Sequence, residues 1–459
     1  MPDSLPTKAD LWGQWVEATI RAAIAAPDTP DPVPMFDDSG DELSRTDAYN
    51  DYRLGRGSGD YLYVLYLLEE PATDPSDIIP VYIGETSNVA SRLLTHVRKV
   101  RDALPVADWE DDGSWGSYSK YDHIATVYDR TDTSLYVWVL EMDNVDTGPY
   151  GYPTYRHELE AKLVGLVHSQ SRFDRVFANR DFVPNRVAYE LGQVGPAWVD
   201  SVASSASRDT QSGPESRRDE LPDTKAALWN DWLDRTLCRD IAAGEPGDPI
   251  PLFATDDDLV VELTEQGGLK RSAAIDERIR QEGGTCVTAD GVSEEFEGLL
   301  YIMYHLSGDG TEPADIVPRY IGKAEAYGKQ NEQSANFEEI AKDRDATRAF
   351  ARWGDGDYWH TGELSNTVFG RGEKKLSWAS ELFEQGANRL TEQTYLWVRA
   401  WDADSCPGPY GYPATLAEVE PLLVGLAYAA HPERLLNHNE VPDDAPANSR
   451  EYAFEPAEE

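Results

Sequence analysis

Hydrophobic and polar positions along the first half of the chain predict a few short strands between helices. The nearly unbroken apolar and aromatic run at 61–68 predicts one strand, and the β-branched segment that ends in Tyr82-Ile83-Gly84 predicts a second. A third strand is expected around Trp138. An amphipathic helix should open the chain, and a later helix should begin near Thr154. That later helix is indicated by apolar residues at positions i, i+4, i+7 and i+8, namely Leu159, Leu163, Leu166 and Val167.

The same succession of segments is then written a second time. "LPTKADLWGQWVEATI" returns in altered form from Leu221, "VYIGE" returns as "RYIGK", and "GPYGYPTYRHELEAKLVGLV" returns as "GPYGYPATLAEVEPLLVGLA". A repeat of this length predicts two homologous domains. We place them at residues 1–200 and 221–440, joined by a Ser-rich polar linker at 201–220 and followed by an acidic tail at 441–459.

Both predicted domains have the same fold class. Each should be a small α+β unit in which helices flank a mostly antiparallel sheet. An extra N-terminal helix precedes each repeat and carries Trp12 and Trp15, or Trp229 and Trp232, near its apolar face.

The charge of the chain is extreme, with 84 acidic against 41 basic residues and a formal net charge of −43. The acidic residues are spread over the whole sequence and Arg outnumbers Lys, which is typical of proteins that work in multimolar salt. At about 1 M salt the Debye length is only ~3 Å, so both self-repulsion and counterion release are weak. Charge therefore neither supports nor excludes nucleic acid as a partner.

The cysteines and the N-terminus bear on the cellular location of the protein and on disulfide or zinc sites. Cys238, Cys286 and Cys406 show neither a CxxC spacing nor a neighbouring His cluster, so no disulfide framework or zinc site is expected. The opening "MPDSLPTKAD" does not have the pattern of a signal peptide, and no apolar run has the length of a membrane span. We expect a cytoplasmic protein without a membrane partner.

Several polar residues of the first half form a candidate site. Tyr63 and Tyr82 stand on adjacent strands, and Arg92 and His96 share one helical face at i and i+4. Phenols can hold a water, an arginine can neutralise charge on a phosphate, and a carboxylate such as Glu160 can hold a divalent metal.

These residues resemble the GIY-YIG nuclease family. The resemblance rests on Tyr61-Leu62-Tyr63, Tyr82-Ile83-Gly84, Arg92 on the following helix, Glu160 in "LEAKLVGLV" and Asn179 in "FANRD". It implies that Tyr63 and Tyr82 position or activate the attacking water, that Arg92 stabilises the scissile phosphate with help from His96, and that Glu160 binds Mg²⁺ or Mn²⁺. Asn179 would complete the site, and the substrate would be nucleic acid, with DNA as the expectation.

The second copy matches this pattern incompletely. Its equivalents are Tyr301, Tyr320, Glu420 as the second metal ligand, and Asn439. It has no arginine at the position of Arg92, so either Arg348 or Arg352 substitutes from farther along or the second site is impaired, which we favour. In addition, Tyr61 and Leu299 replace the glycine of the first motif, and the link between the two motifs is longer than is usual for the family.

Ordinary structural interpretations compete with each of these assignments. The two tyrosines could be half-buried strand aromatics, and Arg92 with His96 could form a solvated helix face. Arg156 stands four residues before Glu160 and would explain it as a helix-surface pair, but Leu416 occupies that position before Glu420.

Three functions remain at this stage. The favoured one is a metal-dependent nuclease whose first repeat cuts phosphodiester bonds, while the second repeat positions substrate or cuts a second site. The alternatives are a non-catalytic nucleic-acid-binding module and a protein–protein scaffold that uses exposed tryptophans of the opening helices, Trp12 and Trp229.

Overall fold

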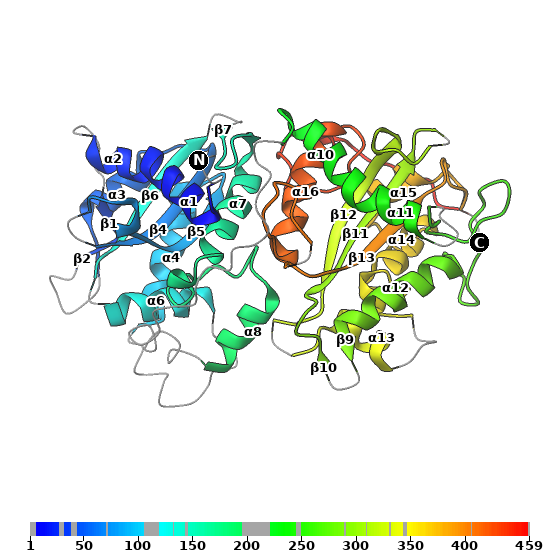
Figure 1. Cartoon of the computed structure of the whole chain (residues 1–459), viewed down its shortest axis with the longest axis horizontal. Helices are drawn as coiled ribbons and strands as arrows, with labels where there is room; N and C mark the ends of the chain where they lie inside the picture. Colours follow the sequence, from blue (N-terminus) through cyan, green and yellow to red (C-terminus); the bar gives the residue numbers. More distant parts are fainter. Residues whose placement is uncertain are drawn as a thin grey trace, which may run out of the picture. The chain divides into compact units, whose positions relative to one another are not determined.

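The computed structural model describes most of the chain (Figure 1). The described residues are 6–26, 32–37, 44–69, 72–104, 119–131, 133–142, 146–194, 221–244, 249–288, 291–308, 310–329, 332–342, 347–404 and 406–457. They divide into two compact units, one formed by Met1–Val183 and Val187–Arg217 and the other by Pro184–Arg186 and Arg218–Glu459. The predicted linker at 201–220 lies outside the described residues.

The first half of the chain contains these elements in order: α1 (Lys8–Val16), a π-helix (Glu17–Arg21), α2 (Ala22–Ala25), β1 (Val33–Pro34), β2 (Phe36–Asp37), β3 (Ser44–Arg45), α3 (Asp47–Leu54), β4 (Asp60–Leu68), a 3-10 turn (Pro75–Asp77), β5 (Ile78–Thr86), α4 (Val89–Asp102), α6 (Lys120–Thr131), β6 (Leu135–Met142), β7 (Asp146–Thr147), β8 (Pro153–Thr154), α7 (Arg156–His168), a 3-10 turn (Ser171–Phe173) and α8 (Asn185–Val194).

The second half repeats much of this order: α10 (Lys225–Leu233), a π-helix (Asp234–Cys238), α11 (Arg239–Ala243), α12 (Ala273–Cys286), β9 (Val287–Thr288), β10 (Gly291–Val292), β11 (Gly298–Leu306), a 3-10 turn (Pro313–Asp315), β12 (Ile316–Glu325), a 3-10 turn (Ala335–Phe337), α13 (Glu338–Lys342), a 3-10 turn (Phe350–Arg352), α14 (His360–Val368), α15 (Leu376–Leu382), β13 (Tyr395–Trp401), α16 (Leu416–Ala430) and α17 (Pro446–Ser449).

Each unit is built on a small antiparallel sheet, which confirms the mixed α+β class. The strand order is β1-β6-β4-β5 in the first unit and β12-β11-β13 in the second. The long central strands, β4 and β11, pair on both sides and are buried over nearly their whole length. A strand covered on both faces needs apolar residues at every position, which explains the unbroken run at 61–68.

The two sheets share one register, including an irregularity. Tyr63 pairs with Gly84 in the first unit and Tyr301 pairs with Gly322 in the second, and each pairing shifts by one residue two positions later. The shift falls where Pro80 and Pro318 enter the strand. Proline has no N–H to give to the ladder, so a bulge at this point wastes no hydrogen bond.

The opening helices are part of the core of each unit. Thr7 and Asp10 form a capping box at the start of α1, and the side chain of Thr224 caps α10. Trp12, Trp15, Trp229 and Trp232 are all buried. Trp15 meets Trp138 of β6 edge-on at 5.7 Å between ring centroids, and Trp232 meets Trp397 of β13 at 6.0 Å. The prediction of exposed tryptophans is therefore wrong, because these rings pack on the sheet.

The late helices, α7 and α16, are buried more completely than the predicted apolar stripe implied. In α7 even Glu158 and Lys162 are inaccessible, and their side chains pair at 2.9 Å. The helix packs on β4 and β5 with α1 against it, so it is enclosed by protein on several sides. This placement puts Glu160 inside the unit, close to the end of the second strand.

The segment 441–457 packs as part of the second unit. Val441, Ala445 and Ala457 are buried, and the backbone N–H of Ala457 donates to the carbonyl of Val368 at 2.9 Å. Within the predicted acidic tail, the described acidic residues are exposed while small apolar residues add to the core.

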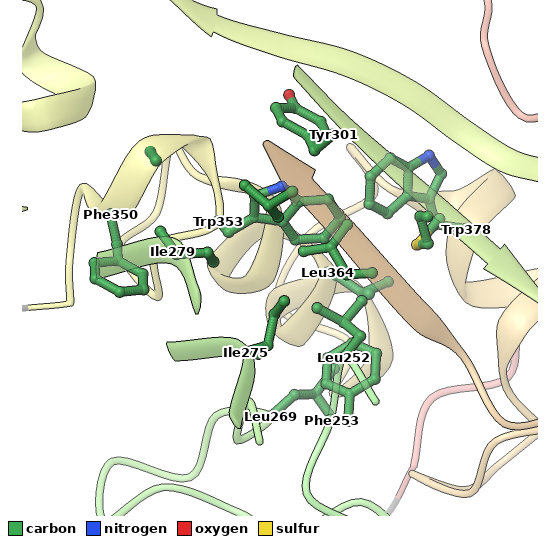
Figure 2. Close-up of a cluster of buried hydrophobic side chains, with 14 of the residues drawn as sticks. Leu252, Phe253, Leu269, Ile275, Ile279, Tyr301, Phe350, Trp353, Leu364 and Trp378 are labelled. Carbon is green, nitrogen blue, oxygen red and sulfur yellow. The ribbon is translucent and has the colours of Figure 1, made fainter. Parts of the chain in front are cut away.

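A large apolar cluster fills the second unit and reaches up to the tyrosines of the sheet (Figure 2). Tyr301, Trp353 and Trp378 stand together at one end of it, with the hydroxyl of Tyr301 turned away from the aliphatic residues. No helix in the described part of the chain has the length and apolar character needed to cross a membrane.

Candidate active site

The glycine of Tyr82-Ile83-Gly84 makes room for a phenol. A Cβ at position 84 would lie 2.4 Å from Tyr63 Oη and 2.8 Å from the ring of Tyr82, far inside van der Waals contact. At Gly322 of the second unit a Cβ would lie 2.7 Å from Tyr301 Oη. The predicted tyrosine therefore lies directly across the predicted glycine in both units, and a larger residue there would force the phenol to move.

His96 joins the two tyrosines of the first unit. It is fully buried, its Nε2 lies 2.8 Å from Tyr63 Oη, and its ring centroid lies 5.0 Å from that of Tyr82. Burial, and to a smaller extent the charges of Lys120 and Arg92, lower the pKa of His96 to about 3. The imidazole is thus neutral, and a solvated helix face does not describe it.

Both phenols stay protonated at neutral pH. Burial raises the pKa of Tyr63 and of Tyr82 well above the ordinary value for tyrosine. Lys120, which the sequence reasoning did not single out, donates a hydrogen bond from Nζ to Tyr82 Oη at 2.8 Å. The pair can therefore orient a water or a phosphate oxygen by hydrogen bonds, but neither phenol is ready to act as a base.

Arg92 lies at the exposed edge of this group. Its side chain is exposed, whereas His96, one turn later on α4, is buried. Burial by itself would lower the pKa of Arg92, and the electrostatic influence of Tyr63, Tyr82 and other neighbours reverses the direction. A guanidinium at the mouth of a buried polar group is well placed to meet an incoming phosphate.

Glu160 is the buried carboxyl of the site, with 9% of the residue exposed. Burial and the nearby carboxylates of Glu85 and Asp181 raise its pKa to about 8, although Lys120 and Arg92 partly offset this. The alternative explanation of a helix-surface pair with Arg156 is wrong. Arg156 instead holds Glu85 at 2.6 Å and Asp60 at 2.5 Å.

A carboxyl of this kind fits a divalent cation, because the cation would compensate the cost of ionising it in the interior. Among the described residues, no group of three or more His, Cys, Asp or Glu side chains is arranged to surround a metal. The first unit thus offers Glu160 as one protein ligand, with Glu85 and Asp181 close enough to influence its charge. Such an ion would take its other ligands from water and substrate, as Mg²⁺ commonly does.

Asn179 holds the site together rather than facing into it. Its amide accepts a hydrogen bond from Ile83 N at 2.9 Å and donates to Ile83 O at 2.8 Å. Next to it, Ala178 N donates to the carbonyl of Val81. Val81 is the residue of β5 that the bulge leaves without a paired residue on β4. These bonds fix the segment that carries Asp181 beside Glu160.

In the second unit this clamp is Asn437, which bonds Ile321 N at 3.0 Å and Ile321 O at 2.8 Å. Asn439, the predicted equivalent, stands two residues later, at the position of Asp181, and lines a pocket. The correction has a simple cause, because "LNHNE" offers two asparagines and only the backbone bonds identify the matching one.

The second unit rebuilds the tyrosine–histidine group from other parts of the chain. Tyr301 Oη lies 3.0 Å from Nε2 of His360, which is the first residue of α14 and is separated from the strand by a long insertion. Lys375 lies near Tyr320, as Lys120 does near Tyr82. Trp378 packs against His360 at 5.2 Å between ring centroids, where the first unit uses Tyr121 at 5.4 Å.

Arg352 brings the missing cation to this second group. Its charge lowers the pKa of Tyr301 and of Tyr320, whereas the side chain of Arg348 is exposed. Of the two substitutes considered from the sequence, the structure thus brings Arg352 to the site.

The chain pays a conformational cost to place Arg352. Phe350, Ala351 and Arg352 have φ values of 23°, 50° and 75°, in the region that L-residues avoid at about 1–3 kcal/mol each. The next carbonyl, that of Trp353, accepts hydrogen bonds from Arg271 Nη1 at 2.7 Å and Thr361 Oγ1 at 2.8 Å. Strain that is held in this way by neighbours is typical of a functional segment.

The carboxylate of the second unit has a different partner. Glu420 Oε2 lies 3.5 Å from Nζ of Lys323, which occupies the position of Glu85 in the repeat. A pocket of about 270 Å³ opens beside it and is lined by Tyr320, Lys374, Lys375, Ser377, Trp378, Glu420, Leu436, Asn437, His438, Asn439 and Glu440.

Some of these residues carried a signal in the sequence and some did not. Lys120 and Lys375 could have been noticed as lysines at comparable places in a chain poor in lysine. Arg352 could be named from the sequence only as one of two candidates, and His360 carried no usable signal, because an insertion separates both from the motif they serve. No family model matches the chain, and no curated protein or solved structure matches it either.

Proposed function

We propose that the first unit is a metal-dependent nuclease that hydrolyses phosphodiester bonds of nucleic acid, with DNA as the expected substrate. The observation that carries this proposal is the repeated site. Two sequences that supply histidine and arginine from different places still assemble two tyrosines, a neutral histidine, a lysine, an arginine and a largely buried glutamate in each unit. Packing alone would not require the same chemistry to be rebuilt from unrelated segments.

In this proposal each residue of the first unit has a defined task. Tyr63 and Tyr82 orient the attacking water by hydrogen bonds, and His96 and Lys120 hold the two phenols in place. Arg92 stabilises the charge that develops on the phosphate as the water attacks in line and the P–O3′ bond breaks; the attacking water gives up a proton to solvent and the leaving 3′ oxygen takes one up. A Mg²⁺ or Mn²⁺ ion held by Glu160 would add positive charge and lower the pKa of a bound water.

The second unit is proposed to bind nucleic acid without cutting it. The specific observation is Lys323, whose ammonium lies 3.5 Å from Glu420, where the first unit has the carboxylate of Glu85. A non-catalytic binding role, considered from the sequence for the whole chain, is thus assigned to this half. The scaffold alternative loses its basis because the tryptophans on which it depended are buried.

The test is cleavage of branched, duplex and single-stranded DNA by the full chain in molar KCl. We expect product with Mg²⁺ or Mn²⁺ and none with a chelator. A folded protein that cuts none of these substrates, and no RNA of the same form, contradicts the proposal.

A further inference from the structure

One position distinguishes the two sites more sharply than any other. The residue after the Tyr-Ile-Gly motif is Glu85 in the first unit and Lys323 in the second. Lys323 Nζ lies 3.5 Å from Glu420 Oε2 and 3.3 Å from Glu325 Oε1, so one ammonium serves two carboxylates. About a fifth of the lysine side chain is exposed, and its partner Glu420 lines the pocket.

This exchange reverses the charge beside the buried glutamate. In the first unit Glu85 adds negative charge near Glu160 and so increases the attraction for a cation. In the second unit Lys323 already supplies a cation to Glu420, and a divalent ion at that carboxylate would meet the repulsion of an ammonium. The second site is therefore built to do without a metal.

Two lysines on the wall of the pocket can bind a phosphate. Lys374 and Lys375 stand on its wall, and Lys375 Nζ lies 3.9 Å from the centroid of the Trp378 ring. Ser377 Oγ lies 3.2 Å from His438 Nε2 and adds hydrogen-bonding capacity at the same wall. Lysine ammonium groups bind phosphate oxygens, and the buried ring of Trp378 supports Lys375 from below.

We propose that the pocket of the second unit binds a phosphodiester group of nucleic acid in the absence of divalent metal, with Lys323 neutralising Glu420 where the first unit would use an ion. This inference rests on the proposed function, since it names the mode of binding at the second site. The two units would then hold one nucleic acid at two points, only one of which requires metal.

The number of Mn²⁺ ions bound per chain tests whether the second site takes a metal. Mn²⁺ binding to the full chain is followed by calorimetry and by the loss of the free-ion EPR signal in molar KCl. We expect one tight equivalent, which Glu160→Gln removes and Glu420→Gln leaves in place. Two tight equivalents, or one that is lost with Glu420→Gln, would overturn the inference.

DNA binding in the absence of metal tests whether the pocket holds a phosphodiester group. The fluorescence anisotropy of a labelled DNA duplex with a single-stranded end is measured with the full chain in EDTA. Lys375→Ala should weaken binding about tenfold, the effect of losing one charge-assisted hydrogen bond. Lys270→Ala, which removes an exposed lysine paired with Glu262 outside the pocket lining, is the matched control and should leave binding unchanged. Equal effects of the two variants would overturn the inference.

Substitutions of Lys323 are followed by both measurements, Mn²⁺ stoichiometry and DNA binding in EDTA. Lys323→Glu should gain a second Mn²⁺ equivalent and lose binding in EDTA, while Lys323→Gln should lose binding in EDTA without gaining metal. Circular dichroism melts confirm that each variant is folded before it is scored. Absence of Mg²⁺-dependent cleavage by the wild type contradicts the nuclease proposal, whereas metal-dependent cleavage with no binding in EDTA contradicts only the present inference.

Discussion

At the scale of single residues, burial decides what the site can do. The tyrosines are too buried to ionise at neutral pH and the histidine too buried to become charged, so these three form a fixed, neutral hydrogen-bonded group. The ionisable member of the first unit's site is Glu160, with a pKa of about 8. The chemistry therefore depends on what neutralises or ionises that one carboxyl.

The phenol of Tyr63 should matter for catalysis far more than for stability. Tyr63→Phe removes the hydrogen bond to His96, which is worth about 1 kcal/mol of folding free energy, and it leaves the ring packing intact. We expect kcat for DNA cleavage to fall about a hundredfold, within the range for losing a positioned proton-transfer or water-orienting group. Tyr301→Phe is the matched change in the second unit and should leave kcat nearly unchanged. Equal losses in the two variants would show that both units cut.

Metal binding to the first unit should depend on pH through Glu160. In the folded protein the pKa of Glu160 is about 8, above the ordinary value of 4.5 for a glutamate, so the folded protein keeps this proton between pH 4.5 and 8. A bound cation requires the ionised form, and its affinity should therefore rise about tenfold per pH unit up to pH 8 and level off above it. Calorimetric titration with Mn²⁺ between pH 6 and 9 measures this. Without metal, the stability due to the protonated carboxyl is present below pH 4.5 and is lost as pH rises toward 8.

An affinity that does not change between pH 6 and 8 would contradict this account of Glu160. Glu160→Gln provides the control, since it should remove the tight binding at every pH. The same variant should also make thermal stability in chelator less sensitive to pH over this range.

At the scale of elements, the sequence predicted the strands and late helices but not the details that connect them. Apolar runs and helical spacing are local signals, and they located β4, β5 and α7. The bulge beside Pro80, the clamp formed by Asn437 and the burial of Trp12 depend on contacts between distant segments, which local patterns do not contain.

The strained segment at Phe350–Arg352 shows most clearly what local sequence patterns cannot predict. Three successive residues with positive φ and no glycine among them contradict local propensity. Contacts from distant residues, among them Arg271 and Thr361 bound to the next carbonyl, hold the conformation. The arginine of the second site could be proposed from the sequence as one of two candidates. Only the folded structure identified which of the two arginines lies at the site.

The close packing of Gly84 under Tyr63 gives a test at this scale. Gly84→Ala would place a Cβ 2.4 Å from Tyr63 Oη, so both phenols of the first site must move. We expect cleavage to fall more than tenfold, because small displacements of positioning groups are costly in catalysis. Gly322→Ala imposes the same crowding on Tyr301 and should spare cleavage. Thermal melts of both variants should show similar, modest destabilisation, and unaffected cleavage by Gly84→Ala would contradict the placement of Tyr63 in the active site.

At the scale of the whole molecule, the net charge of −43 dominates. Self-repulsion among surface carboxylates opposes the compact state, and salt screens it. The midpoint of thermal unfolding should therefore rise by several degrees between 0.1 M and 2 M KCl. Circular dichroism melts over a KCl series measure this, and a midpoint that stays constant or falls would contradict adaptation to salt.

The two related units of the molecule are proposed to have different functions. One keeps a carboxylate pair beside its phenols and is proposed to cut, while the other has a lysine in place of one carboxylate and is proposed to hold. Each variant in one unit therefore has a matched variant in the other. This internal control is available because the repeat preserves the register of both sheets.

The most direct measurement compares cleavage of a branched DNA by the wild type, Glu160→Gln and Glu420→Gln, in molar KCl with Mn²⁺. The account predicts that Glu160→Gln reduces the rate at least a hundredfold, as expected for a metal ligand, and that Glu420→Gln cuts at nearly the wild-type rate. A wild type that is folded and binds DNA but does not cut would contradict the nuclease proposal. Loss of cutting with Glu420→Gln alone would reverse the roles assigned to the two units.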